Sequence, residues 1–448
     1  MRLVNDMNTP ICDFVNAYSK RNDIRLHMPG HKGKGALGVE ALDITEIEGA
    51  DSLYEANGII AESEANASLI FGCPTYYSTE GSSQCIRAMM QLVSIYAQSR
   101  SEKPYVLAGR NAHKAFHSAV ALLDIDVDWL YSEDMQNYLS CNISARELSE
   151  IFQKCEKKPT AVYLTSPDYL GNVLDIAEIS EICHKNNILL LVDNAHGAYL
   201  KFLRPSKHPM DLGADICCDS AHKTLPVLTG GAYLHLSKQV DSEFSKQVKN
   251  ALSLFGSTSP SYLILQSLDK ANVYLENHRE RLVVFALLLG VLKNHLIENG
   301  YELYGNEELK ITVQTKKYGY YGFDFANILA KKGIVCEFCD PDFVVLMLTP
   351  EIDNLNEIEN AMLSIPRQSP INEKIPAFVR LKQSISIRKA VLSPSESVPI
   401  EKALGRVVAI TSVGCPPAVP IAVAGEIIDK NAIECFKYYG IMKCNVIK

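Results

Sequence analysis

The chain has 448 residues, of which 47% are hydrophobic and 21% charged, a composition typical of a globular protein with two or three domains. The net charge of −8 at pH 7 argues against nucleic-acid partners, whose binding proteins normally carry a basic surface. The sequence has no run of 18 apolar residues and no apolar core of a secretory signal, so we expect a cytoplasmic protein without a membrane span.

The 13 cysteines are scattered along the chain, and their odd number fits a reducing compartment better than a disulfide framework. Cys336 and Cys339 form the only CxxC pair. Because a zinc site needs four ligands and no second pair follows at suitable spacing, we expect no metal.

Residues 1–55 are polar and irregular, and they predict an N-terminal arm. In residues 56–298, which predict a large domain, short apolar runs alternate with amphipathic stretches. The runs predict strands at Tyr105–Ala108, Val127–Tyr131, Ala161–Thr165, Ile188–Val192, Ile216–Cys218 and Gly231–Leu236. Helices are predicted at Gln84–Ala97, Ala145–Cys155 and Ile176–Asn186, and the apolar run Leu282–Leu292 predicts a buried helix. This alternation predicts an α/β fold with a mostly parallel central sheet and helices on both faces.

Residues 299–448 differ in pattern and predict a smaller C-terminal α+β domain. Its predicted strands are Glu308–Thr315, Gly333–Cys339 and Phe343–Thr349, and its predicted helices are Phe325–Lys332 and Leu355–Leu363. The stretch 365–448 is rich in proline, and we expect it to pack back on the main body.

Ligands of open parallel sheets bind beyond the carboxyl ends of the strands, so the residues that follow each predicted strand carry the most information. Asp193 to Gly197 follow one strand, although an aspartate there can also simply cap a turn. Ser220, His222 and Lys223 follow another. A lysine at a strand end is usually solvated, but in a pocket its pKa falls and it becomes a nucleophile.

A third segment, Gly81-Ser82-Ser83, opens a predicted helix. Backbone N–H groups and hydroxyls at a helix start can bind a phosphate. Serine near a helix start is also a routine capping residue, so this motif has little weight when taken alone.

In this order, the three segments resemble the fold type I family of pyridoxal 5'-phosphate enzymes, and more narrowly the compact form of the Orn/Lys/Arg decarboxylase group. The resemblance covers nearly the whole chain. The segments that carry it are His27–Gly33, Gly109–Lys114, Thr165–Gly171, Asp193–Gly197, Ser220–Thr224, Ser257–Leu263 and Gly405–Glu426.

The resemblance implies a role for each matching residue. Lys223 would hold pyridoxal phosphate covalently, and Asp193 would pair with its ring nitrogen. His113 would stack on one face of the ring and Ala195 would lie under the other. The phosphate would be held by Ser82, Ser83, Ser220 and His222, and by Thr258 or Ser257 of a neighbouring subunit, which implies at least a homodimer.

The implied reaction is decarboxylation of a basic amino acid, arginine in preference to lysine or ornithine, to a polyamine or its precursor. Lys223, His113, Asp193 and His222 would be the catalytic residues, with Lys223 and His222 both open as proton donors. Candidates for binding the far cationic end of the substrate are Glu46, Glu48, Asp51 and Glu426. Two alternatives remain: an aminotransferase or lyase of the same fold, and a non-catalytic regulatory relative.

Two residues depart from the pattern of many relatives. Glu80 stands where asparagine is common, and Asn194 where glutamate is common. A carboxylate beside a phosphate is unfavourable, so we expect Glu80 to point away from the phosphate or to pair with a cation.

Overall fold

The computed structural model describes residues 7–21, 23–133, 135, 137–240, 242–376, 380–410 and 419–448. The start of the chain, on which the expectation of no secretory signal rests, lies outside the described residues, as does 411–418 within the segment Gly405–Glu426. The chain forms two compact units. One comprises Met1–Arg100 with Leu189–Leu282, and the other Ser101–Ile188 with Val283–Lys448.

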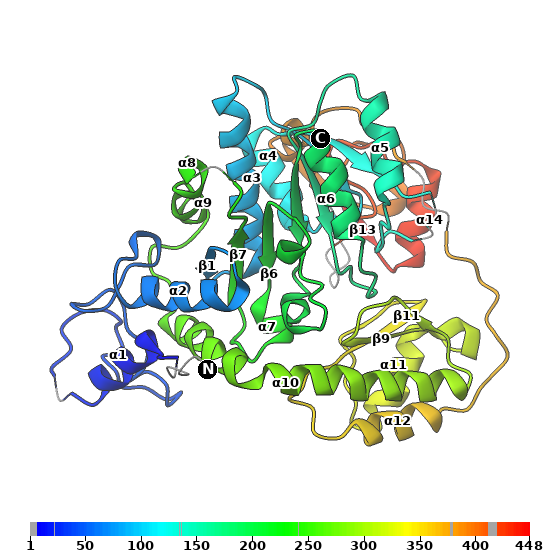
Figure 1. The fold of residues 1–448 in the computed structure, drawn as a ribbon. Coiled ribbons are helices and arrows are strands. Elements are labelled where there is room, and N and C mark those ends of the chain that lie inside the picture. Colours follow the sequence, from blue (N-terminus) through cyan, green and yellow to red (C-terminus); the bar gives the residue numbers. More distant parts are fainter. Residues whose placement is uncertain are drawn as a thin grey trace. The chain divides into compact units, whose positions relative to one another are not determined.

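Four strands of the first unit lie in the order β1 (Thr75–Ser78), β7 (Ala232–Leu236), β6 (Ile216–Asp219) and β5 (Leu189–Asp193) (Figure 1). β5 and β6 run parallel, whereas β7 is antiparallel to both β6 and β1. Every residue of β5, β6 and β7 is buried, which explains their nearly continuous apolar sequences. Since β5 and β6 are parallel, Asp193 and Asp219 end neighbouring strands at the same edge.

The helices of the first unit are α1 (Pro10–Ser19), α2 (Ile59–Phe71), α3 (Gly81–Ser99), α7 (Ala221–Thr224), α8 (Ser242–Ser245), α9 (Val248–Ser253) and the start of α10 (Tyr262–Glu298). Short 3-10 turns lie at Leu53–Glu55, Ala198–Phe202 and Pro209–Asp211. α3 packs against β1, β6 and β7 through its buried apolar face. This packing brings the first turn of α3 to the sheet.

The second unit contains three parallel strands in the order β4 (Ala161–Thr165), β2 (Tyr105–Gly109) and β3 (Asp126–Leu130). Its neighbouring helices in the chain are α4 (Lys114–Leu123), α5 (Ala145–Lys154) and α6 (Ile176–Lys185). A capping box of Ser144 and Glu147 fixes the start of α5.

The rest of the second unit has a four-stranded antiparallel sheet in the order β10 (Phe338–Cys339), β11 (Phe343–Met347), β9 (Lys310–Gln314) and β8 (Leu303–Tyr304). It also contains the antiparallel pair β12 (Ser395–Pro399) and β13 (Lys443–Ile447). Its helices are the end of α10, α11 (Gly322–Ala330), α12 (Leu355–Leu363), α13 (Ile387–Val391) and α14 (Lys430–Tyr438), with 3-10 turns at Thr315–Tyr318 and Ile400–Lys402.

The described part of 365–448 packs back within the second unit, as predicted. Arg388 of α13 donates to the carbonyls of Ala121 and Leu122 at the end of α4. Arg110, directly after β2, donates to the carbonyls of Pro420 and Ile421. Two arginines thus hold the C-terminal segment against the elements around β2.

The predicted α/β class is confirmed, and each of the six strands predicted for the large domain is present within one or two residues of its predicted bounds. Several elements were not predicted, among them β1, α2, α4 and also α1, which lies in the arm that was expected to be irregular. The predicted strand Gly333–Cys339 is wrong over most of its length, because only Phe338–Cys339 pair with a neighbour. The domain limits 1–55, 56–298 and 299–448 stay a prediction.

The run Leu282–Leu292 is helical, as predicted, but the prediction that it is buried is wrong for four of its ten apolar side chains. Val284, Leu287, Leu288 and Val291 are each more than half exposed. Their spacing of three and four residues places them on one face of α10. The run has a buried face and an exposed face, both apolar.

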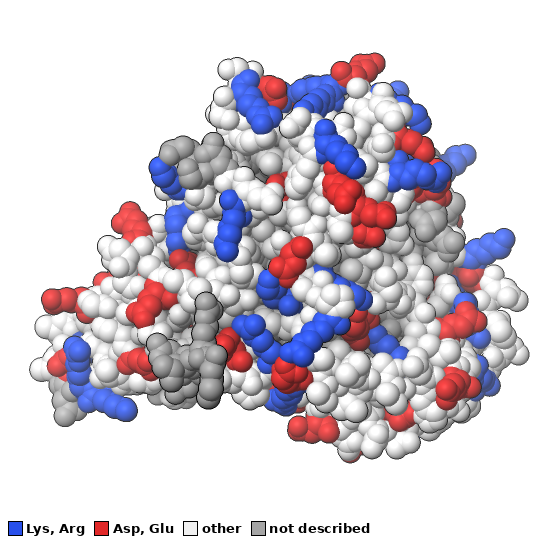
Figure 2. Space-filling view, viewed as in Figure 1, with Lys and Arg blue, Asp and Glu red and all other residues white. Residues whose placement is uncertain are grey.

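Of the helices that the structure describes, none combines the length and the apolar character needed to cross a membrane. The cysteines within the described ranges are free thiols. On the face drawn in Figure 2, acidic and basic side chains are interspersed. This mixture agrees with the modest net charge of the chain.

Candidate active site

Lys223 lies in α7, directly after β6. Its backbone N–H donates to the carbonyl of Ser220 at 2.9 Å, which closes the turn between strand and helix. Its Nζ lies 3.0 Å from Nε2 of His196. The ε-amine therefore contacts a second titratable side chain at the strand end, an arrangement that can activate a lysine nucleophile.

His196 belongs to the turn that follows β5. The N–H of Gly197 donates to the carbonyl of Asn194 at 2.8 Å, and a Cβ at position 197 would lie 1.9 Å from Asn194 Oδ1, so only glycine fits. Asp193 and His196 are 2% and 4% exposed. Asp193 Oδ1 accepts the backbone N–H of Ala195 at 3.2 Å. The turn holds a buried carboxylate and a buried imidazole within four residues.

The first turn of α3 carries Ser82 and Ser83, and the residue before it, Glu80, makes no side-chain cap. The N–H of Gly81 donates to the carbonyl of Gly230 at 2.7 Å. A Cβ on Gly230 would lie 2.8 Å from a backbone oxygen, so the two loops approach closely because glycine is present. The uncapped helix start is a ready anion-binding position.

His222 links this helix start to the lysine. Its ring Nδ1 lies 3.1 Å from the carbonyl of Gly231 and 3.4 Å from Ser220 Oγ. Burial lowers the pKa of His222, and the charge of Lys223 adds to this effect, while the hydrogen bond to Gly231 opposes it. The lowered pKa favours the neutral ring, whose Nδ1 lies 3.1 Å from the Gly231 carbonyl and 3.4 Å from the backbone nitrogen of Gly230.

These groups, all in the first unit, fit the parts of pyridoxal phosphate. The uncapped turn of α3 with its two serines suits a phosphate. The ε-amine of Lys223 suits an aldehyde, and the buried carboxylate of Asp193 suits a protonated ring nitrogen. Ala195, 7% exposed, is small enough to lie under a ring.

His113 lies in the second unit, where it caps α4. Its Nδ1 accepts the N–H of Ala115 at 3.2 Å. This cap gives the histidine a structural role at the start of α4. Since His113 and Lys223 belong to different units, stacking of His113 on a cofactor ring stays a prediction.

Glu80 is exposed, and its carboxylate accepts the backbone N–H of Ser257 at 2.5 Å. Its partner is thus a backbone amide rather than the cation that the sequence suggested as one possibility. Ser257 and Thr258 are exposed and lie next to the start of α3 of their own chain. Their reach to a neighbouring subunit stays a prediction.

Two of the acids considered for the substrate's cationic end have structural partners. Asp51 accepts the backbone N–H groups of Ser52, Asn57, Gly58, Ile60 and Ala61, and so caps α2. Glu426 is buried, accepts the N–H of Val423 and pairs with Arg110. Both carboxylates serve the fold. Glu46 and Glu48 are exposed.

Sequence reasoning gave no role to His196 and none to Asp219. Asp219, 0% exposed, accepts a hydrogen bond from Asn194 Nδ2 at 2.7 Å. A glutamate at position 194, as in many relatives, would bring a second carboxylate against this buried one. The uncharged amide at position 194 therefore suits the buried carboxylate of Asp219. The two residues lie 25 positions apart in the sequence, and nothing else in the sequence marks their contact.

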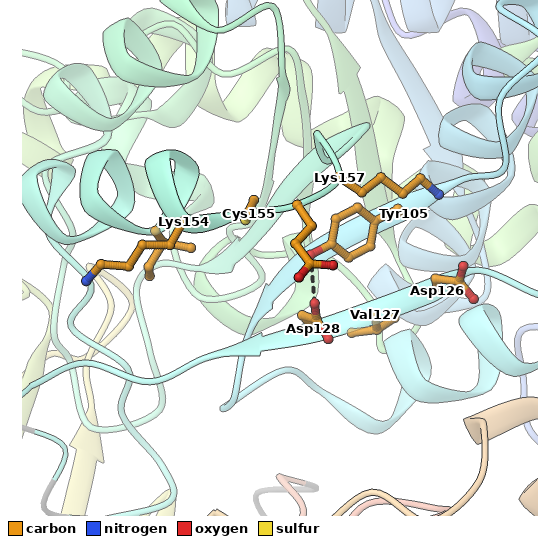
Figure 3. Close-up of a pocket in the computed structure, with 9 residues that line it drawn as sticks. Tyr105, Asp126, Val127, Asp128, Lys154, Cys155 and Lys157 are labelled. Atoms are coloured by element: carbon orange, nitrogen blue, oxygen red, sulfur yellow. Dashed lines mark hydrogen bonds between the residues drawn. The ribbon is translucent and has the colours of Figure 1, made fainter.

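A hollow of about 570 Å³ lies at the amino ends of β2 and β3 (Figure 3). Tyr105 and Asp126, which begin these strands, line it, and the Tyr105 hydroxyl donates to Asp128 at 2.7 Å. The candidate catalytic residues follow carboxyl ends of strands instead. This hollow is therefore not the candidate active site.

The models of two domains of one protein family match the chain. "Orn/Lys/Arg decarboxylase, major domain" matches residues 9–294, and "Orn/Lys/Arg decarboxylase, C-terminal domain" matches residues 373–445. The first match includes every candidate residue from Ser82 to Thr258.

Similar proteins extend over nearly the full length. The uncharacterized protein YaaO of Bacillus subtilis is 28% identical over 98% of this chain and 96% of its own. An arginine decarboxylase of Halalkalibacterium halodurans is 28% identical over 94% of this chain and 91% of its own. The crystal structure of a lysine decarboxylase from Francisella novicida superimposes with a TM-score of 0.79 at 16% identity, covering 99% of this chain and 82% of that one. At that identity the likeness supports the fold alone.

Proposed function

Because the chain belongs to the Orn/Lys/Arg decarboxylase family, we propose that it removes the α-carboxyl group of a basic amino acid with pyridoxal phosphate held on Lys223. The observation that carries the proposal is the arrangement around this lysine. Its Nζ contacts His196, while His222 beside it joins the turn that binds the uncapped start of α3.

Each residue has a task that its position supports. Ser82, Ser83, Ser220 and His222 would hold the phosphate, and Asp193 would hold the proton on the ring nitrogen. When bound, the cofactor supplies a sink for the electron pair that carbon dioxide leaves behind. The protein contributes orientation, and electrostatic stabilisation in a site that excludes water.

We propose that Lys223 donates the proton that replaces the carboxyl group, and that His196 is the hydrogen-bond partner of this lysine. Nζ and Nε2 are within hydrogen-bond distance at 3.0 Å, so a proton can be held between them. The Nδ1 of His222 is instead within hydrogen-bond distance of the backbone at Gly230 and Gly231. The choice that the sequence left open between Lys223 and His222 therefore favours Lys223.

We propose arginine as the preferred substrate, since relatives of near full length are named arginine decarboxylases. The product would then be agmatine, a precursor of polyamines. The exposed Ser257 and Thr258 support a homodimer with a shared site, and we place the protein in the cytoplasm.

The test supplies the purified protein and pyridoxal phosphate with carboxyl-labelled arginine, lysine or ornithine. We expect labelled carbon dioxide and the matching amine, fastest from arginine, and neither from Lys223→Ala. Faster turnover of lysine or ornithine would correct the substrate. Keto-acid formation without carbon dioxide would identify an aminotransferase, and no product from any of the three would refute the proposal.

A further inference from the structure

A fully buried carboxylate lies behind the candidate active site. Asp219, the last residue of β6, receives hydrogen bonds at both oxygens. Oδ2 accepts from Nε2 of His208 at 3.0 Å and of His235 at 3.1 Å. Oδ1 accepts from Asn194 Nδ2 at 2.7 Å. One side chain therefore joins the end of β6 to β7, to the turn after β5 and to the loop that carries His208.

The cluster is fully buried and lies beside an aromatic ring. The ring of Phe71 lies 5.7 Å from the ring of His208 and 4.6 Å from that of His235. Burial opposes ionisation of Asp219, but the two facing imidazoles outweigh burial and lower its pKa. In turn, the carboxylate raises the pKa of His235 against the effect of burial. In an apolar site, such bonds are strong and their loss is costly.

The strand register shows what the cluster holds. Asp193 pairs with Cys218, so Asp219 and Asn194, the next residues, lie on the opposite face of the sheet from Asp193. The backbone N–H of Asn194 also donates to the carbonyl of Cys218 at 3.0 Å. Asn194 is thus tied to β6 through its backbone and its side chain.

The two residues of this hydrogen bond each lie shortly before one residue of the candidate catalytic pair, His196 and Lys223. Asn194 opens the turn that carries His196, and Asp219 immediately precedes the turn that carries Lys223. We propose that the Asn194–Asp219 bond, held from behind by His208 and His235, is a clamp that fixes the distance between the imidazole of His196 and the ε-amine of Lys223. Asp219 is then a positioning residue, and its importance for catalysis rests on the proposed function.

A metal ion is the competing occupant of the cluster. One ligand atom each from His208, Cys217 and Asp219 lies within 4.8 Å of the others. Cys217 Sγ donates to Asp219 Oδ1 at 3.8 Å, and burial and then the charge of Asp219 raise the pKa of its thiol well above its ordinary value. Both oxygens of Asp219 already accept hydrogen bonds, so the cluster is complete without an ion.

The test exchanges the amide and the carboxylate of the Asn194–Asp219 hydrogen bond. Asn194→Asp places two carboxylates in contact, and Asp219→Asn removes the charged acceptor. The double variant Asn194→Asp/Asp219→Asn restores one donor and one acceptor in reversed order, and the new amide oxygen can still accept from the two histidines. Asp215→Asn is the matched control, because Asp215 accepts the N–H of Leu190 at 2.7 Å and so ties β5 near its other end.

The first readout does not depend on catalysis. Reductive methylation of Lys223, measured by peptide mass spectrometry against pH, gives the pKa of its ε-amine in each variant. We expect both single variants to shift this pKa in the same direction as His196→Ala does, the double variant to return towards wild type, and Asp215→Asn to leave it unchanged. In the loaded enzyme, the single variants should lose about 100-fold in kcat, the scale expected for a 1 Å misplacement, with most of it regained in the double variant.

Wild-type labelling profiles in both folded single variants would overturn the clamp, as would a double variant no better than the worse single one. Stoichiometric metal in the wild type that is absent from Asp219→Asn would replace the clamp by a metal site. If the variants label as expected but the loaded wild type releases no carbon dioxide, the proposed function fails while the clamp stands.

Discussion

Replacing Glu426 by alanine should lower the free energy of unfolding by about 3–5 kcal/mol, because it leaves Arg110 buried without this counter-charge. The two side chains are 1% and 2% exposed, and Nη2 of Arg110 lies 3.4 Å from Oε2 of Glu426. The carbonyls of Pro420 and Ile421 would still accept from the guanidinium at 2.8 and 2.9 Å. These carbonyl groups accept from Nη1 and Nη2 but do not neutralise the charge, so the loss should approach the full value.

A fluorescent side chain, Trp129, lies beside Arg110 and can be used to follow unfolding. The chain has 1 tryptophan, Trp129, and the guanidinium carbon of Arg110 lies 5.6 Å from the centroid of its ring. Urea unfolding followed by tryptophan fluorescence therefore measures the stability of this region. The matched control is Glu396→Ala, which breaks the exposed pair of Glu396 and Arg406, side chains 44% and 35% exposed. Pairs of this kind contribute about 0–1 kcal/mol.

Glu426→Gln separates charge from hydrogen bonding. The amide oxygen of glutamine can still accept the N–H of Val423, which lies 2.7 Å from the carboxylate. We expect its loss to fall between those of Glu426→Ala and the control. A Glu426→Ala protein within about 1 kcal/mol of wild type, or no less stable than Glu396→Ala, would refute the reasoning about buried charge.

Three further predictions concern titration, catalysis and assembly. Burial raises the pKa of Asp340 to about 7, so the stabilising proton is lost as pH rises through that value. Asp340→Asn should therefore gain stability over wild type from about pH 4 to 7 and then level off in thermal melts; a pH-independent difference would contradict this. Asp193→Ala should lose at least about 100-fold in kcat with added cofactor, and near-normal turnover would exclude its pairing with the ring nitrogen. Thr258→Ala should release the cofactor faster only if the site is shared between subunits, so wild-type retention on dialysis would count against sharing.

Strands and helices were predicted best where the local pattern of apolar residues marks the element. The strand Ala161–Thr165 and the helix Leu355–Leu363 have their predicted bounds. β1 (Thr75–Ser78) was missed because it has four residues and pairs with β7, which comes much later in the chain. Pairing over such a sequence distance leaves little local signal.

Apolar residue type also misled the prediction of burial. Val335, within the predicted strand Gly333–Cys339, is 90% exposed. On α10, Leu287 and Val291 are both 67% exposed. Apolar atoms cover much of any folded protein's surface, so an apolar run predicts burial only when its partner elements are known.

The chemistry of the candidate site was easier to predict than its contacts. Lys223 and Asp193 stand out because each follows an apolar strand, and the sheet brings such strand ends to one edge. Their partners depend on register and on turn geometry, which one sequence does not display. His196 meets Lys223 only because the tight turn at Gly197 follows β5 in the observed conformation.

The two strand-end aspartates show why register decides function here. In the sequence, Asp193 and Asp219 are equivalent, since each closes a buried apolar strand. In the structure, Asp193 pairs with Cys218, so the two carboxylates lie on opposite faces of the sheet. Two histidines bind Asp219 from behind, whereas Asp193 stays on the other face. A slip of one residue between β5 and β6 would place both carboxylates on the same face of the sheet, so strand pairing, and not residue type, gives the two aspartates their different environments.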